Sequence, residues 1–137
     1  MGLILDSTVL IGAERGGVGI PQMLREVRDR HGEVEVGVSV VTIAELVHGA
    51  FRAGSSVVQQ RRLSFIDRVC SEVPVHPVSL QIARIIGQIE GEQAAQGIRF
   101  AFEDLAIGAT ALHLGYGIAT RNVRHFRPIP GLTVVEL

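Results

Sequence analysis

Short apolar runs alternate along the chain with longer segments whose apolar residues recur at helical spacing. The apolar runs predict buried strands at Leu3–Leu5, Val34–Val40, Gly117–Thr120 and Thr133–Val135. Apolar residues three and four positions apart predict helices at Pro21–Arg30, Thr42–Arg52, Ser55–Ser71, Ser79–Ala95 and Phe102–Leu114. Strands that alternate with helices indicate an α/β fold, in which a parallel sheet is covered on both faces.

Capping and turn residues set the expected boundaries of these elements. Asp6 ends the first strand and brings its carboxylate into a turn or helix start, before a short helix at 9–13. Thr42 and Glu45 match a capping box, so the central helix is expected to begin at Thr42. Two prolines interrupt 73–78, which is typical of an edge strand. Neither a repeat nor a linker is visible, so we expect one domain over residues 1–137.

The basic residues are all arginine. The 13 arginines face 14 acidic residues for a net charge of −1, and lysine is absent. A Walker-type phosphate loop and Schiff-base catalysis both require lysine, so both are excluded. With no Trp and one Tyr, aromatic platforms for single-stranded nucleic acid are poorly supplied. Nucleic-acid binding would therefore depend on a local patch.

Features tied to cellular location point to the cytoplasm. The single Cys70 excludes an intramolecular disulfide and fits a reducing compartment, and we expect it to be buried as a small hydrophobic residue. The N-terminus lacks the basic region of a signal peptide. No apolar stretch is long enough to span a bilayer. We expect a soluble cytoplasmic protein with no membrane partner.

Three acidic residues are placed where parallel sheets bind ligands, at the carboxyl ends of the strands. Asp6 follows the first strand, Glu45 lies early in the helix after the second, and Asp104 opens the Ala-rich helix before the strand at 117–120. Each has a structural explanation, since Asp6 could be an N-cap, Glu45 a capping-box residue and Asp104 a partner of the helix dipole. Together, however, they would repel one another unless a cation such as Mg²⁺ or Mn²⁺ lay between them. Such a site supports phosphodiester hydrolysis.

Basic residues cluster just after the strand that ends at Thr120. Arg121, Arg124, His125 and Arg127 could contact a phosphate backbone beside the acidic pocket, or they could form a solvated turn. The Arg61–Arg62 pair is expected on an exposed helix face. The remaining histidines lack the spacing of a zinc site.

Four segments in order carry a resemblance to a known family. They are Leu3–Ile11 (LILDSTVLI), Ser39–Gly49 (SVVTIAELVHG), Glu103–Leu112 (EDLAIGATAL) and Thr120–Phe126 (TRNVRHF). The chain resembles, over essentially its whole length, the PIN-domain ribonucleases, specifically the VapC toxins of bacterial VapBC toxin–antitoxin modules.

This resemblance implies a three-layer α/β/α domain that cleaves RNA by metal-activated attack of water on a phosphodiester, with Mg²⁺ or Mn²⁺ as cofactor. Asp6 and Asp104 match the family's metal-binding aspartates, and Glu45 matches its acidic glutamate. Ser7 and Thr120 match small hydroxyl residues that line the family's pocket.

The last segment departs from the family's pattern. Many relatives have an Asp where this chain has His125, and some where it has Asn122. Asn122 could still orient a water molecule or a ligand, and His125 could contact phosphate. The departure puts a second metal in doubt more than the first.

The resemblance also implies partners. The expected partners are an RNA substrate, a second copy in a homodimer, and a VapB-like antitoxin that forms a hetero-oligomer with the toxin. The apolar faces of the helices at 42–52 and 55–71 are the expected antitoxin groove, although packing in the core explains the same residues.

Four alternative functions are compatible with parts of the sequence. A phosphatase with Asp6 as nucleophile needs a second Asp two residues later, where this chain has Thr8. A phospho-receiver domain lacks its acidic pair and lysine, and a dinucleotide-binding loop lacks its glycine pattern. A catalytically impaired PIN-like module that binds RNA or a partner remains open because of Asn122 and His125.

Overall fold

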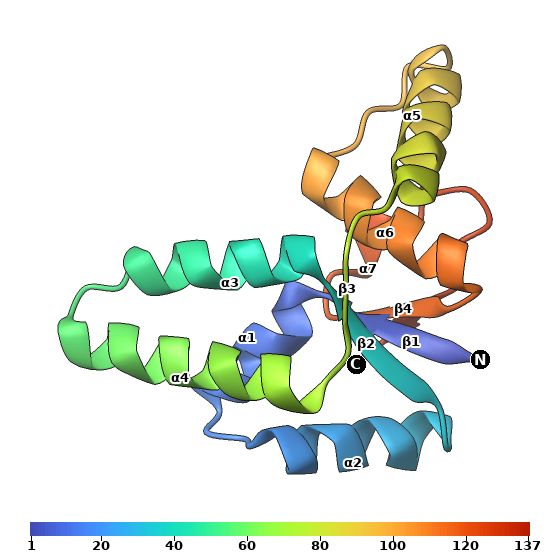
Figure 1. Ribbon diagram of the computed structural model, residues 1–137. Coiled ribbons are helices and arrows are strands. Elements are labelled where there is room, and N and C mark those ends of the chain that lie inside the picture. Colours follow the sequence, from blue (N-terminus) through green and yellow to red (C-terminus); the bar gives the residue numbers. More distant parts are fainter.

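A computed structural model describes residues 1–137, which form a five-stranded sheet flanked by helices (Figure 1). The strands are β1 (Gly2–Leu5), β2 (Glu35–Ser39), β3 (Val75–His76), β4 (Gly117–Thr120) and β5 (Val134–Glu136). The helices are α1 (Ser7–Arg15), α2 (Ile20–His31), α3 (Val40–Phe51), α4 (Ser56–Glu72), α5 (Leu80–Ala94), α6 (Phe102–Leu114) and α7 (Val123–Phe126). Every strand pair is parallel, which confirms the predicted fold class.

Alternating side chains of the central strand β1 divide the core into two layers. Leu3 and Leu5 pack with α1, α2, α3 and α4 on one face of the sheet. Ile4, from the same strand, packs with α5, α6 and α7 on the other face. Because successive strand residues point to opposite faces, a run of three apolar residues serves both layers at once.

The strand order β3-β2-β1-β4-β5 creates a switch point between β1 and β4. From β1 the chain continues to β2 and β3 on one side of the sheet, and then crosses to the other side of β1, where β4 and β5 follow. Loops that leave β1 and β4 therefore turn in opposite directions and leave a crevice at their carboxyl ends. Asp6 follows β1 at this crevice, and the 120–122 turn follows β4.

The start of α3 differs from the predicted start. The helix begins at Val40 because the Ser39 hydroxyl accepts a hydrogen bond from the Val41 amide at 3.1 Å, so Ser39 is the N-cap. Thr42 is fully buried inside the helix, and the capping box with Glu45 is not formed. Glu45 thus has no capping role in this structure.

The burial expected for Cys70 was wrong, and of the arginine pair at 61–62 only Arg61 is exposed as expected. Cys70 is exposed on α4 because the buried stripe of that helix is formed by Phe65, Ile66 and Val69. Arg62 is half-buried and donates to the Gly49 carbonyl at 3.0 Å, which ties α4 to the end of α3. The short β3 does lie at the sheet edge, as its prolines predicted. No helix combines the length and apolar character that crossing a bilayer would need.

Candidate active site

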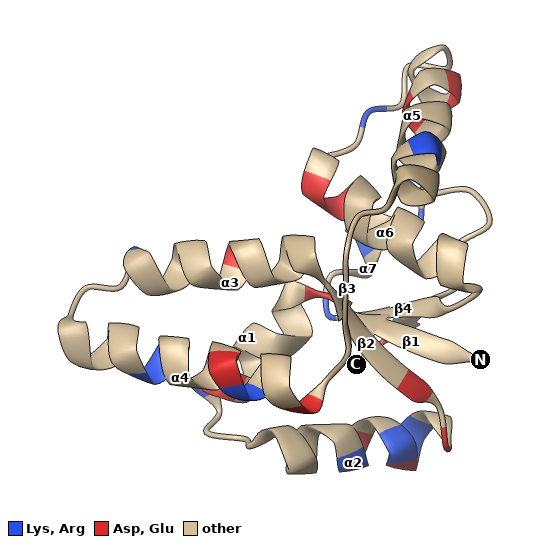
Figure 2. Ribbon diagram, in the orientation of Figure 1, with Lys and Arg blue, Asp and Glu red and all other residues tan.

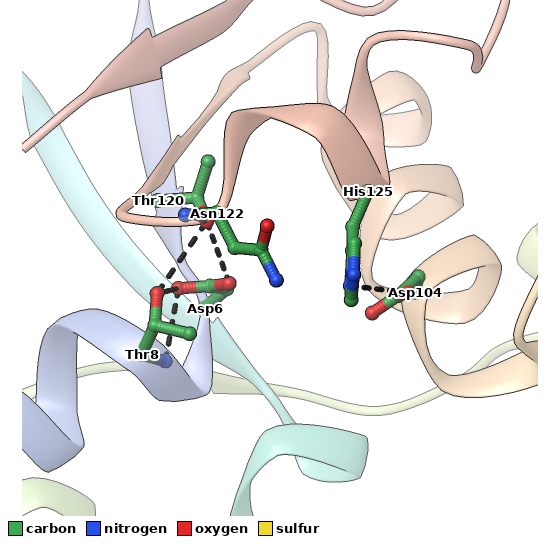
Figure 3. Close-up of polar contacts among 6 residues, drawn as sticks. All are labelled: Asp6, Thr8, Asp104, Thr120, Asn122 and His125. Atoms are coloured by element: carbon green, nitrogen blue, oxygen red, sulfur yellow. Dashed lines mark hydrogen bonds and ion pairs between the residues drawn. The ribbon is translucent and has the colours of Figure 1, made fainter.

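Asp6 is held in a single orientation at the switch point. The carboxylate is only 4% exposed and caps α1, accepting from the Thr8 amide at 3.1 Å and the Val9 amide at 3.4 Å on Oδ1. The Thr8 hydroxyl also donates to Oδ1, at 2.6 Å, and the Thr120 hydroxyl donates to Oδ2 at 2.7 Å. The N-cap explanation for Asp6 is therefore correct, and the same contacts present this side chain at the carboxyl edge of the sheet (Figure 3).

The two threonines link Asp6 to the turn after β4. The Arg121 amide donates to the Thr8 hydroxyl at 3.0 Å, and the Asn122 amide donates to the Thr120 hydroxyl at 2.8 Å. Each hydroxyl has one proton, and accepting from an amide leaves that proton for Asp6. The loop after β4 thus fixes the direction of both hydroxyls. Thr8 was not predicted as a site residue, since its role depends on contact with a turn more than 110 residues away.

Glu45 extends from α3 toward the same edge of the sheet. Burial raises the pKa of its carboxyl above the usual value, and the negative charges of Asp104, Asp6 and Glu103 raise it further. The nearby Ser7 hydroxyl acts in the opposite direction and lowers this pKa. The Oε1 atom is buried and has no hydrogen-bond partner in the structure. A buried acceptor without a donor lowers the free energy of unfolding. Glu45 therefore does not stabilise the fold through this oxygen, which makes it a candidate functional residue.

Asp104 lies in the first turn of α6 and pairs with His125 of α7. The distance from His125 Nδ1 to Asp104 Oδ2 is 3.2 Å (Figure 3). Burial raises the pKa of Asp104, the nearby His125 opposes that rise, and Asp6 and Glu103 add to it. Asp6 and Asp104 thus lie close enough to Glu45 to raise its pKa, and all three carboxylates face the same edge of the sheet.

The remaining predicted residues take different positions. The Asn122 side chain points into the space between Asp6 and the His125–Asp104 pair (Figure 3). Arg121 instead packs its guanidinium on α1 over Gly12, where no side chain intervenes. Arg124 and Arg127 are exposed and form no ion pair.

The donor set fits a hard divalent cation in its chemistry. Carboxylate oxygens are the preferred protein ligands of Mg²⁺ and Mn²⁺, and a cation would offset the repulsion that raises the pKa values of Glu45 and Asp104. It would also give the buried Glu45 oxygen a counter-charge. The side chains do not converge on one point, because no group of three or more His, Cys, Asp and Glu lies close enough to hold an ion directly.

Comparison with known proteins places this chain in a family. No family model matches the chain. Ribonuclease VapC1 of Rickettsia felis is 30% identical over 137 residues, which is 100% of this chain and 97% of the relative. The chain belongs to the VapC ribonuclease family. A second VapC, the tRNA(fMet)-specific endonuclease of Salmonella typhimurium, is 30% identical over 99 residues, covering 72% of this chain and 73% of the relative.

A solved VapC structure has the same fold. The DNA-bound VapBC complex of Salmonella typhimurium contains a chain with a TM-score of 0.82 and 26% identity, covering 99% of this chain and 98% of that one. The three-layer α/β/α architecture expected from the resemblance is therefore confirmed for this VapC-family chain.

Proposed function

We propose that this VapC-family chain is the toxin of a type II toxin–antitoxin module and an endoribonuclease that depends on Mg²⁺ or Mn²⁺. The observation that carries the proposal is the position of Asp6, Glu45 and Asp104 along one edge of the sheet, where burial first, and then the negative charges of neighbouring carboxylates, raise the pKa values of Glu45 and Asp104. Carboxylates kept together at such a cost are typical of a site that works with a cation.

Each residue has a distinct role in this proposal. Asp6 and Asp104 would hold the cation, which when bound supplies activation of water and charge neutralisation at the phosphodiester. The hydroxyls of Thr8 and Thr120 keep Asp6 from rotating, so its oxygens need not reorganise during the reaction. Glu45, which keeps a free buried oxygen, would accept a proton from the attacking water.

Other side chains would position the RNA. Asn122 offers an amide that points into the site, and Ser7 offers a hydroxyl beside Glu45. Arg124 forms no ion pair and would contact a backbone phosphate, and His125 would hold Asp104 in place. Arg121 would act through its backbone amide, because its guanidinium lies on α1.

Sequencing of RNA ends tests the activity and the substrate together. Purified chain is incubated with total cellular RNA and Mn²⁺, in parallel with Asp6→Asn and Asp104→Asn variants and an EDTA control. We expect new ends only with the native chain and metal, and tRNA is the first substrate to inspect because of the Salmonella relative. Intact RNA at every Mn²⁺ concentration, with RNA still bound, would instead support a catalytically impaired binding module. Cleavage by both variants at the rate of the native chain would reject the assignment of Asp6 and Asp104 as metal ligands.

The proposal includes a VapB-like antitoxin and a homodimer in the cytoplasm. The cavity between α1, α3 and α4 is lined by apolar residues and by Glu14, Glu45 and Arg62, which suits an amphipathic peptide segment. Co-expression with a small gene, should one lie directly upstream, followed by light scattering, would reveal the complex. A chain that stays monomeric and purifies alone would contradict this part.

A further inference from the structure

A second cavity opens beside the acidic site, between α1, α3 and the start of α6. Its volume is about 620 Å³, within the range of small-molecule pockets. Glu45 and Ser7 form one side of it, and the side chains of Phe102 and Glu103 from α6 form another. Acidic positions in α3 and at the start of α6 are coloured red in Figure 2, and Glu45 and Glu103 of these two helices both line the cavity.

Phe102 is the unexplained residue of this cavity. Its side chain is 56% exposed, and it belongs to neither of the two core clusters. Phe65 and Phe126 are buried, and Phe100 packs against the second core cluster. Because Phe102 packs in neither core cluster, its ring contributes little to the stability of the fold. It lies two residues before Asp104 and lines the cavity beside the acidic site.

The chemistry of the lining selects the kind of group that can enter. Two carboxylates, Glu45 and Glu103, line the cavity with the apolar side chains of three residues from α1 and α3, and no arginine is among the lining residues. A phosphate would be repelled here, whereas a neutral base offers a flat face to an aromatic ring and N–H donors to carboxylates. Phosphate contacts have a separate location, since the His125–Asp104 pair places α7 and the exposed Arg124 next to the start of α6.

We propose that this cavity binds one nucleobase of the RNA substrate, stacked on Phe102, and so sets the position of the chain relative to Asp6 and Asp104. The inference rests on the proposed ribonuclease function and assigns the base-binding part of that site. Stacking on an aromatic ring tolerates any base, so Phe102 determines placement more than sequence choice. His48, which also lines the cavity, is exposed and adds a second planar group.

Binding measured without metal separates this inference from the catalytic proposal. A fluorescein-labelled pool of mixed-sequence RNA twelve nucleotides long is titrated with full-length protein in EDTA, and anisotropy is recorded. We expect Phe102→Ala and Phe102→Leu to raise Kd by about 5- to 150-fold, and Phe102→Trp to stay within about twofold of the native chain. Phe51→Ala is the matched control, because Phe51 is also exposed, at 64%, but lies at the far end of α3 (Figure 1).

A ribose-phosphate oligomer of the same length without bases completes a double-mutant cycle. Phe102→Ala should weaken binding of the base-containing pool and leave the affinity for the abasic oligomer unchanged. Equal weakening of both ligands, or none, would overturn the inference, as would a native chain that binds both equally. If Phe102→Ala alters only self-association or antitoxin binding, the ring belongs to a protein interface and the inference also fails. If the native chain binds the base-containing pool more tightly than the abasic oligomer but cleaves no RNA with Mn²⁺, the catalytic proposal fails and the base-binding inference stands.

Discussion

Replacing Thr120 with valine tests whether the threonine hydroxyls organise the site. Thr120 is completely buried, donates to Asp6 Oδ2 at 2.7 Å and accepts from the Asn122 amide at 2.8 Å. Valine has the same shape, so Thr120→Val removes both hydrogen bonds without leaving a cavity. A hydrogen bond to a charged group contributes about 1.5–3 kcal/mol and a neutral one about 0.5–1.5 kcal/mol, so we expect a loss of about 2–4 kcal/mol in the free energy of unfolding.

Thr120→Ser provides the matched comparison, since it keeps the hydroxyl and loses one methyl group, at a cost of about 1 kcal/mol. Thr42→Val is a second control, because Thr42 is also completely buried and its hydroxyl has no hydrogen-bond partner. Urea unfolding in EDTA gives the three free energies directly. For a chain of this length, Thr120→Val should also lower Tm by about 10 °C. A Thr120→Val protein as stable as Thr120→Ser would refute the reasoning, because the hydroxyl would then contribute nothing to holding Asp6.

Four further variants test other contacts. Folding raises the pKa of Glu45 above its usual 4.5, so the folded state disfavours the charged carboxylate. Glu45→Gln removes that charge and should stabilise the metal-free chain by about 1 kcal/mol after allowance for solvent screening. Urea unfolding at several pH values measures this gain in unfolding free energy. The gain should vanish below about pH 4, where Glu45 is protonated in both states, and grow as the pH rises through the raised pKa. A gain that does not change with pH would contradict this explanation. His125→Ala removes the group that holds down the pKa of Asp104, so RNA cleavage should fall more at pH 6 than at pH 8, and an unchanged pH–rate profile would count against this role. Arg62→Met should cost about 1.5–3 kcal/mol of unfolding free energy, because it removes the hydrogen bond that ties α4 to the end of α3. Arg28→Met is the comparison, since it breaks an ion pair whose side chains are 45% and 91% exposed and should cost about 0–1 kcal/mol. Equal losses in the two variants would show that the Arg62 hydrogen bond contributes no more than an exposed ion pair.

The fold follows from the sequence almost element by element, because the apolar pattern reflects burial directly. The main error was at the start of α3, where a β-branched run through Val40 and Val41 resembled a continuing strand. In the structure, Ser39 caps the helix and Leu46 and Ala50 bury its inner face, so tertiary packing overrides the local β preference. The exposure of Cys70 was missed for a related reason, since a lone cysteine on a helix carries no signal about which face it occupies.

The acidic residues of the site were predictable, but their supporting contacts were not. Asp6, Glu45 and Asp104 are found by a general rule, that carboxyl ends of parallel strands share one edge. Thr8 has no such rule, because its function depends on the amide of Arg121, which the register of β1 and β4 brings near. Distant backbone contacts of this kind appear only once the sheet is assembled.

The departure at Asn122 and His125 has a physical consequence for the site. A carboxylate at either position would add a negative charge to a cluster in which burial and mutual repulsion already raise the pKa values of Glu45 and Asp104. The amide of Asn122 adds no charge, and His125 offsets part of the repulsion at Asp104 through its 3.2 Å contact. Compared with a chain that has a carboxylate at either position, this chain has less charge repulsion in its metal-free state. It also has one charged oxygen ligand fewer for a metal ion. Since hard cations are held by the number and charge of their oxygen ligands, we expect, if the proposed function is correct, that the chain binds one cation through Asp6 and Asp104 rather than two.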